Sequence, residues 1–447
     1  MNAFSLAKLF WNKLPRSGFS SRAAPAKSAR TLEPRRSVLI AWELGGGLGH
    51  VQRLLSIASK LDEHGYSPVF AFRNLEGALT VQSKFPGSPI LNAPHWQRDL
   101  KQPPTQSGLA YHYADVLYRC GYRSEEELRL LVRLWEELFE QVNPALVLCD
   151  HSPTAVLAVA GRIPVVHVGS GFATPPVGLP FRTLHLSNAE GARAREAQVL
   201  SVIRGVQAEL GAPMLSEVSQ LLGLADNITC CLPELDPYRM YRLEPADGPT
   251  HLLPKPHPMG CDDFVFGYLT AEDKRVPALL QSLAKAKITG GIYVRRCTPE
   301  CVAAVANSSI TLYMSPRNMA ETLKNASVVL HHGGLSTAEA AMAMGRPQFL
   351  LPRHLEQLLT ANAVASLGCG FNLLGQRRDP GEIISRALAR GAYRREAARV
   401  AERIASRSQP RTGEKILELC LKHLGHSPAR PSVSSTVDTS DARPATT

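Results

Sequence analysis

The residues best suited to chemistry lie in one short turn near position 330, where a histidine pair, a glycine pair and a Ser/Thr pair follow one another. They are His331, His332, Gly333, Gly334, Ser336 and Thr337. The glycines let a ligand approach the backbone closely, and either hydroxyl can cap a helix that begins there. Free N–H groups and the positive dipole end of such a helix favour a diphosphate, to which either histidine could donate. An ordinary strand-to-helix turn has the same pattern, so both interpretations stay open.

A second glycine-rich turn, residues 45–49, is followed directly by His50. It does not satisfy the G-x-G-x-x-G fingerprint of dinucleotide-binding proteins, because His50 occupies the third glycine position. It also lacks the G-K-[ST] ending of a phosphate-binding P-loop. The turn therefore argues against both of these nucleotide-binding classes.

The elements that must position these turns alternate between strands and helices. In the first half, apolar runs at 37–44, 68–72, 145–150 and 163–170 predict buried parallel strands. Periodic apolar positions predict helices after residue 50 and over 124–142. This alternation indicates an α/β domain over 36–240 with a doubly wound parallel sheet.

A proline-rich stretch without periodicity, 241–261, predicts an interdomain linker. A second α/β set follows over 262–425. Its expected strands are 263–269, 291–294, 310–314, 327–332 and 347–352, and its expected helices are 275–287 and 336–344. We expect an arginine-rich helical region and a helix over 414–424 to close this domain. Two such halves predict a ligand-binding cleft between the carboxyl ends of two sheets.

The net charge of +11 comes from two segments. Residues 1–32 hold six basic residues and no acid, and residues 376–411 hold ten arginines against four acids. The rest of the chain is nearly neutral, which argues against a nucleic-acid-binding body. The basic segments still permit a peripheral contact with an anionic membrane.

Both ends of the chain differ in composition from its body. Residues 1–35 predict a disordered basic extension, with a mitochondrial transit peptide as the alternative, and residues 426–447 predict a disordered tail. Nine scattered cysteines without C-x-x-C spacing indicate reduced thiols. No apolar run approaches the ~18–20 residues that span a bilayer. These features predict a cytoplasmic protein.

The stretch from 331 to 357 resembles the nucleotide-diphospho-sugar signature of GT-B glycosyltransferases related to the UDP-glycosyltransferases, including bacterial macrolide glycosyltransferases. That signature reads H-H-G-G-x-G-T-x-x-E…G-x-P…P-x-x-x-D-Q. The gap-free match comprises His331, His332, Gly333, Gly334, Thr337, Gly345, Pro347, Pro352, and Glu356-Gln357 in place of Asp-Gln. A weaker similarity over residues 49–70 extends the resemblance to the family's opening segment. The resemblance as a whole implies two Rossmann-like domains facing across a cleft.

Two positions depart from this signature. Ser336 stands where the family usually has glycine. Ala340 stands where the family often has a ribose-binding glutamate, and Glu339 is one residue away, about 100° round the helix. Either a local shift brings Glu339 to the ribose, or that contact is missing at a cost of about 1–2 kcal/mol. By resemblance, Glu356 and Gln357 contact donor-sugar hydroxyls, although an ordinary polar loop is the alternative.

The resemblance also implies a catalytic histidine, and His50 is the candidate. At a helix start the dipole disfavours the imidazolium, so the ring is kept neutral as a general base for an acceptor hydroxyl. Asp150 ends the strand 145–150, where the family has its histidine-orienting aspartate. Their alternative roles are a solvent-facing helix residue for His50 and a helix cap for Asp150.

The function implied is an inverting glycosyltransferase that moves a hexose from a nucleotide-diphosphate sugar, expected to be UDP-linked, to a small-molecule or lipid-like hydroxyl. No D-x-D occurs in the chain, which disfavours metal-dependent sugar transfer of the other common fold, and no cofactor is expected. The alternatives are a nucleotide-sugar epimerase, a lipid-linked sugar transferase, or, given Ala340, a catalytically silent nucleotide-sugar-binding protein. Residues 73–123 and 171–225 show no motif that identifies the acceptor.

Overall fold

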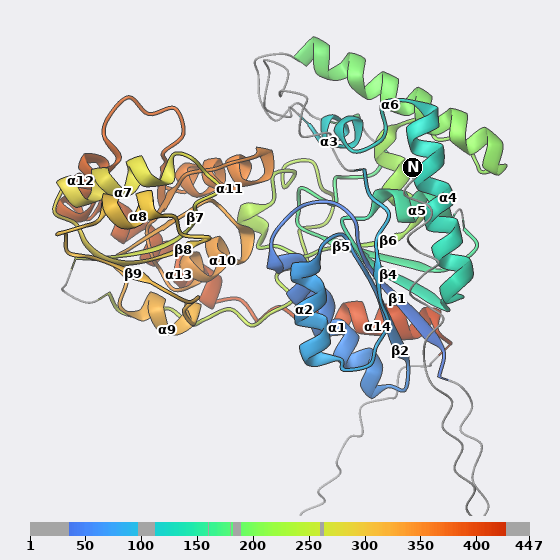
Figure 1. Cartoon of the computed structure of the whole chain (residues 1–447), viewed down its shortest axis with the longest axis horizontal. Helices are drawn as coiled ribbons and strands as arrows, with labels where there is room; N and C mark the ends of the chain where they lie inside the picture. The colour runs from blue at the N-terminus through green and yellow to red at the C-terminus, as the bar shows by residue number, and fades with distance from the viewer. Residues whose placement is uncertain are drawn as a thin grey trace, which may run out of the picture. The chain divides into compact units, whose positions relative to one another are not determined.

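The computed structural model describes residues 35–96, 112–159, 161–178, 180–181, 189–259 and 263–425. Its first sheet has six parallel strands in the order β3-β2-β1-β4-β5-β6 (Figure 1). The strands are β1 (Ser37–Trp42), β2 (Ser67–Phe72), β3 (Ile90–Asn92), β4 (Leu146–Asp150), β5 (Val165–Gly169) and β6 (Asp226–Thr229). The helices around it are α1 (Leu48–Glu63), α2 (Leu75–Lys84), α3 (Tyr113–Arg119), α4 (Glu125–Val142), α5 (Pro153–Val159) and α6 (Ala189–Leu210), with the 3₁₀ turn η3 (Val218–Leu224).

The second sheet is also parallel and six-stranded, in the order β12-β11-β10-β7-β8-β9. Its strands are β7 (Phe264–Thr270), β8 (Thr289–Arg295), β9 (Ile310–Tyr313), β10 (Val328–His331), β11 (Gln348–Leu350) and β12 (Gly370–Asn372). Its helices are α7 (Val276–Lys285), α8 (Pro299–Ala304), α9 (Met319–Lys324), α10 (Leu335–Ala343), α11 (Leu355–Ser366), α12 (Pro380–Arg390) and α13 (Ala392–Ala405). Counted in chain order, both sheets follow 3-2-1-4-5-6, the order of dinucleotide-binding folds. The predicted doubly wound α/β class is therefore confirmed.

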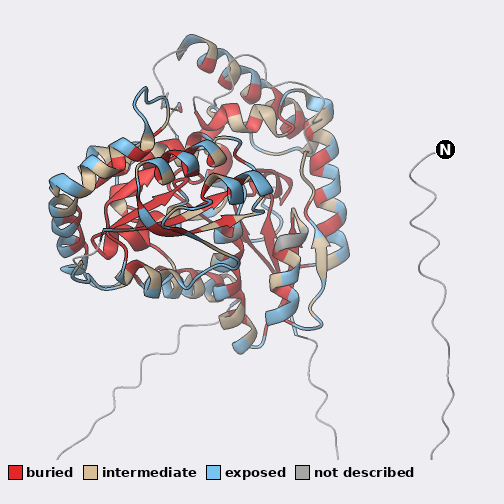
Figure 2. Ribbon diagram, turned by 60° about the vertical axis from the view of Figure 1, so that its left-hand side comes forward, coloured by how far each residue is buried: buried red, intermediate tan, exposed pale blue. Residues whose placement is uncertain are grey.

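Helices cover both faces of each sheet. Since successive residues of a strand point to opposite faces, consecutive strand residues are all buried. In β1, Leu39 and Ala41 pack under α3–α6, whereas Val38 and Ile40 pack under α1 and α2. Figure 2 shows the buried strands and the helices with one exposed face. This two-sided burial explains why the strands read in the sequence as continuous apolar runs.

The last helix, α14 (Thr412–His423), packs against the first sheet and not the second. Its buried residues Ile416 and Cys420 belong to the cluster that contains Leu54 of α1. Just after the helix, the carbonyl of Leu424 accepts a hydrogen bond of 2.8 Å from Arg36. The expectation that the helix over 414–424 closes the second domain is therefore wrong. The apolar periodicity of residues 414–424 predicts a helix with one buried face, but it does not identify the sheet against which that face packs.

Residues 241–259 contain neither helix nor strand, and Asp247 among them contacts the first turn of α14. Thr412 donates to the carbonyl of Asp247 at 2.7 Å, and Lys415 pairs with the Asp247 carboxylate. No helix in the described ranges is long and apolar enough to cross a membrane. Residues 1–34 and 426–447, for which an extension and a tail were expected, lie outside the described residues.

Candidate active site

The site of the first half lies where its strand order reverses, between β1 and β4. In open parallel sheets, ligands bind outside the carboxyl ends of the strands at this point. Trp42, the last residue of β1, is in register with Asp150, the last residue of β4. The turn at 45–49 and the residues after Asp150 are thereby brought together at one edge of the sheet.

His50 and Asp150, which the resemblance pairs, are in contact. The Nδ1 atom of His50 lies 2.9 Å from Oδ1 of Asp150, whose side chain is fully buried. Trp42 stacks on the imidazole, with ring centroids 5.4 Å apart and planes 17° apart. Because an ionised carboxylate only accepts hydrogen bonds, Nδ1 carries the hydrogen and Nε2 keeps a free lone pair in the neutral ring.

Arg53, three residues after His50 on α1, binds the other oxygen of Asp150. Burial opposes ionisation of this carboxyl, but Arg53 and His50 outweigh it and hold the pKa of Asp150 well below its usual range. The carboxylate is therefore permanently available to orient His50. No sequence motif points to Arg53, although i and i+3 spacing puts it on the same helical face as His50.

The glycine turn lies close against the ring of His50. Gly45 has a φ of 87° and Gly47 a φ of 97°, the left-handed region that favours glycine. A Cβ on Gly45 would lie 2.8 Å from Nε2 of His50, whereas a Cβ on Gly46 would meet no atom within 4 Å. The requirement for glycine at position 45 thus comes from both the backbone and the histidine.

On the hypothesis that His50 is the general base, we expect Gly45→Ala to lower kcat by about 10²-fold, because the methyl group would crowd its Nε2 atom. The positive φ adds a stability cost of roughly 1–2 kcal/mol. Gly46→Ala is the matched control, for which activity should be retained. Steady-state kinetics and thermal unfolding of both variants check this, and equal activity of the two would contradict it.

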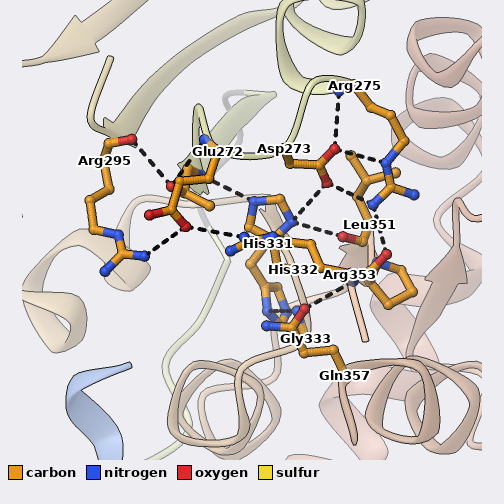
Figure 3. Close-up of polar contacts among 12 residues, drawn as sticks. Glu272, Asp273, Arg275, Arg295, His331, His332, Gly333, Leu351, Arg353 and Gln357 are labelled. Atoms are coloured by element: carbon orange, nitrogen blue, oxygen red, sulfur yellow. Dashed lines mark hydrogen bonds and ion pairs between the residues drawn. The ribbon is translucent and has the colours of Figure 1, made fainter. Parts of the chain in front are cut away.

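In the second half, the two histidines are part of the framework of the turn at 331–334 (Figure 3). The Nδ1 atom of His331 accepts from the N–H of Gly333 at 3.1 Å, and its Nε2 lies 2.9 Å from Oε1 of Gln348. Burial lowers the pKa of His331 to about 4, so this ring is neutral. Its role as a donor to phosphate is not supported, because both nitrogens already bind the protein.

His332 is engaged in the same way. Its Nε2 accepts from the N–H of Thr270 at 3.1 Å, and its Nδ1 lies 2.8 Å from the carbonyl oxygen of Leu351. These bonds join the ends of β7, β10 and β11. The expectation that His332 donates a hydrogen bond to phosphate is therefore wrong. In this structure, His332 fixes the turn that carries the glycines.

The start of α10 is open to a ligand. Its N-cap is Gly334, so the expectation that Ser336 or Thr337 caps the helix is wrong, and no described side chain caps it. Gly333 has a φ of 92°, and a Cβ there would lie 2.8 Å from the carbonyl oxygen of Gln357. The N–H groups of the first helical turn and the dipole remain available to an anion.

This helix start faces the first half. A Cβ on Gly49 would lie 3.7 Å from Oγ of Ser336, so the first turns of α1 and α10 are neighbours. Oγ of Ser170, just after β5, donates to Oε1 of Glu356 in α11. A pocket between these elements is lined by residues of both halves, including Phe172 and Leu335.

Glu339 lies inside the protein. It is 1% exposed, and its Oε1 accepts from the N–H of Leu232 at 2.9 Å. Ala340 packs in a hydrophobic cluster with Phe266 and Leu323. The local shift that would bring Glu339 to a ribose is absent from the described α10, so neither position presents a carboxylate at the helix surface.

Burial raises the pKa of Glu339 to about 8, outweighing the hydrogen bond from Leu232 and the charge of Arg53. The unfolded carboxyl titrates near 4.5, so between these values the folded chain holds a proton that the unfolded chain has lost. The free energy of unfolding therefore falls as the pH rises through this range. We expect Glu339→Gln to gain stability relative to the unchanged chain from pH 5 to pH 8. The free energy of unfolding, measured in urea at pH 5 and pH 8, checks this. Glu402→Gln is the control: Glu402 is exposed, so the difference in stability between this variant and the unchanged chain should be the same at both pH values.

The two residues at the start of α11 are both partly exposed. Gln357 accepts from the N–H of Arg353 at 3.0 Å, and Glu356 is held by Ser170. Arg353 in turn pairs with Glu272, which also meets Arg295 and Arg296. No sequence motif pointed to this arginine cluster beside the turn at 331–334.

The described residues include no group of three or more His, Cys, Asp or Glu placed to hold a metal ion.

Comparison with solved structures identifies the class of fold. CalG4, the calicheamicin glycosyltransferase, is 20% identical with a TM-score of 0.62, over 88% of this chain and 100% of that one. Glycosyltransferase VinC in complex with DTDP is 14% identical with a TM-score of 0.55, over 87% and 100%. The spinosyn rhamnosyltransferase SpnG with spinosyn aglycone is 16% identical with a TM-score of 0.57, over 86% and 99%. The chain has the GT-B fold of these glycosyltransferases, as the resemblance predicted.

A particular family matches part of the chain. Residues 311–419 match the model of the erythromycin biosynthesis protein CIII-like C-terminal domain. This segment contains the turn at 331–337 and the helices α10 to α13. No curated protein sequence matches the chain.

Proposed function

We propose that this protein is an inverting glycosyltransferase that transfers a hexose from a nucleotide-diphosphate sugar to an acceptor hydroxyl. The observation that carries the proposal is the His50–Asp150 pair, with Nδ1 of His50 2.9 Å from Oδ1 of Asp150, beside the uncapped start of α10. A general base and an anion-binding helix start are the two devices that such a displacement requires.

In the proposed reaction, Nε2 of His50 takes the proton of the acceptor hydroxyl while its oxygen attacks the anomeric carbon. The bond from that carbon to the diphosphate oxygen breaks, and configuration inverts because attack and departure occur on opposite faces. The N–H groups and dipole of the first turn of α10 stabilise the leaving diphosphate. Asp150 holds the imidazole in its tautomer and stabilises the imidazolium that forms.

The donor nucleotide is proposed to be UDP or TDP. UDP follows from the sequence resemblance, whereas the VinC structure contains DTDP. Without a surface carboxylate at positions 339 and 340, one ribose contact of the family is lost, which weakens donor binding by about 1–2 kcal/mol and weakens the case for UDP in particular. We therefore include both nucleotides in the test.

The acceptor is proposed to be a small molecule or a lipid-like compound with a hydroxyl group. No metal ion or cofactor enters the proposed reaction, because its charges are handled by His50, Asp150 and the start of α10. A peripheral contact with an anionic membrane, through the basic segments, and a cytoplasmic location remain parts of the proposal.

A screen of UDP- and TDP-sugars against alcohol and phenol acceptors, with products identified by mass spectrometry, tests the proposal. We expect a glycoside of inverted configuration from the unchanged chain and none from His50→Ala. Free epimerised sugar without an acceptor would indicate an epimerase. Nucleotide binding by calorimetry without turnover across the panel would indicate a silent binding protein, and transfer unaffected by His50→Ala would refute the role of His50.

A further inference from the structure

One carboxylate, that of Glu272, is shared by three arginines beside the turn at 331–334. Nη2 of Arg353 and Nη2 of Arg295 lie 3.1 and 3.3 Å from its Oε2 atom. Nη1 of Arg296 lies 2.5 Å from its Oε1 atom. The arginine cluster, defined as Arg295, Arg296 and Arg353, therefore brings three positive charges to one negative charge. Guanidinium groups gathered in this way bind phosphate oxygens as well as carboxylate oxygens.

The contact between Glu272 and Arg353 joins the two loops that flank this turn (Figure 3). In the second sheet, β10 lies between β7 and β11. Glu272 lies two residues after the end of β7, and Arg353 lies three residues after the end of β11. The turn that follows β10 leads to the uncapped start of α10. The arginine cluster and the proposed diphosphate site are thus at neighbouring strand ends on one edge of the sheet.

Gln357 connects Arg353 to the glycines of the turn. The backbone N–H of Arg353 donates to Oε1 of Gln357 at 3.0 Å. The carbonyl oxygen of Gln357 lies 2.8 Å from the point where a Cβ on Gly333 would be. A ligand with two phosphate groups can therefore place one at the helix start and the other at the arginine cluster.

The side chains of the cluster can be reached from solvent. Arg295 and Arg353 are 30% and 31% exposed, Arg296 is 62% exposed and Glu272 is 29% exposed. Ion pairs at such exposure are individually weak, so an incoming anion can replace the carboxylate. Burial opposes ionisation of Glu272, but Arg295 and Arg353 outweigh it and lower its pKa, so the carboxylate is charged at neutral pH.

The next carboxylate along the chain, that of Asp273, is held differently. It is buried, and it accepts hydrogen bonds from the backbone N–H, Nε and Nη2 of Arg275 at 3.0, 2.9 and 2.6 Å. Its Oδ2 atom also lies 3.7 Å from Nδ1 of His332. Asp273 therefore fixes the loop after β7, and the loop keeps its shape when the side chain of Glu272 turns away.

We propose that Glu272 is a built-in competitor of the donor: its carboxylate occupies the arginine cluster in the free protein, and the donor diphosphate displaces it and binds the three guanidinium groups. This inference rests on the proposed glycosyl transfer. The displaced carboxylate turns to solvent and stays ionised, so no bond or proton is exchanged. The departing diphosphate gains negative charge as its bond to the anomeric carbon breaks, and the freed guanidinium groups stabilise that charge.

Glu272→Gln in the full chain tests the competition, because it keeps the size of the side chain and removes its charge. We expect the Kd for inorganic pyrophosphate and for UDP, measured by calorimetry, to fall about 5–10-fold. Glu382→Gln is the matched control, since Glu382 pairs with Arg386 on α12 of the same half, and its Kd values should equal those of the unchanged chain. An unchanged or higher Kd in Glu272→Gln would overturn the proposal.

A second set of variants tests whether Glu272 acts through the arginines. Replacing Arg296 and Arg353 together by glutamine should raise the Kd for pyrophosphate at least about 10-fold, whereas Arg386→Gln should not. In the background without these two arginines, Glu272→Gln should no longer tighten binding. Tightening of equal size with and without the arginines would show a general charge effect and would overturn the proposal. Thermal midpoints of all variants establish that the fold is retained.

These binding measurements do not depend on turnover. If the unchanged chain transfers no sugar but Glu272→Gln tightens pyrophosphate binding, the proposed function fails and the role of Glu272 at an anion site stands. If transfer occurs and Glu272→Gln does not tighten binding of either probe, the inference fails and the proposed function stands. Failure of pyrophosphate and UDP to bind any of these variants would also overturn the inference.

Discussion

Replacing His50 by alanine is expected to lower kcat for sugar transfer by about 10²–10⁴-fold, while the affinity for the donor nucleotide remains nearly unchanged. In His50, Nδ1 is held by Asp150, and Nε2 lies 2.8 Å from the point where a Cβ of residue 45 would be, so glycine at that position keeps Nε2 uncrowded. Loss of the ring removes the proton acceptor but no contact to the start of α10. Steady-state kinetics with a saturating acceptor and calorimetry with UDP and TDP measure the two quantities separately.

Asp150→Asn provides the companion measurement. The amide cannot hold Nδ1–H as a carboxylate does, so the tautomer with a free Nε2 lone pair loses its preference. We expect a decrease in kcat of similar order, although the size of the side chain hardly changes. If His50→Ala is inactive and Asp150→Asn retains full kcat, the orienting role of Asp150 is contradicted while the base is not.

Arg53→Met is expected to destabilise the protein by about 3–5 kcal/mol, because it leaves the Asp150 carboxylate buried with only His50 as partner. Arg129→Met is the matched control, since Arg129 pairs with Glu209 on the exposed surface, and it should change stability little. Urea unfolding followed by tryptophan fluorescence is the measurement. An equal loss in both variants would show that the buried pair has no special role.

The pH dependence of this loss has a definite sign. The pKa of Asp150 is depressed in the folded chain, so its ionic contacts stabilise above the ordinary value of 3.8 and are lost as the pH falls below it. The difference between the unchanged chain and Arg53→Met should therefore be largest near neutral pH and shrink in acid. A difference that grows in acid would contradict the assignment of Arg53 as the partner that keeps Asp150 ionised.

Local patterns in the sequence predicted most of the elements close to where they occur. The run at 145–150 became β4, and the periodic segment at 124–142 became α4, because buried strands and amphipathic helices are recognisable within a few residues. The pairing of His50 with Asp150 also came from the sequence, but only through the family resemblance. Their separation by 100 positions carries no local signal.

The donor turn shows the limit of such patterns. The residue types at 331–337 predicted a ligand-binding turn, yet the two histidines face inward, to Gln348 for His331 and to Thr270 and Leu351 for His332. The direction of a side chain at a strand end depends on which strands lie beside it. The same reason applies to Glu339, whose carboxylate accepts a hydrogen bond from the N–H of Leu232 in a distant segment.

The sequence by itself determined the α/β class and the two glycine-rich turns, because these depend on residue type and short-range spacing. The candidate base was implied by the family resemblance. Only the tertiary structure decided that Arg53 binds Asp150, that α14 packs on the first sheet and that His151 stands unpaired beside His50. The first two depend on contacts between distant parts of the chain, and the third on the lack of a hydrogen-bond partner from any described part of it. Burial then sets their energies, since a charge or a hydrogen-bonding group inside the protein is stabilised only by the partner that the fold provides.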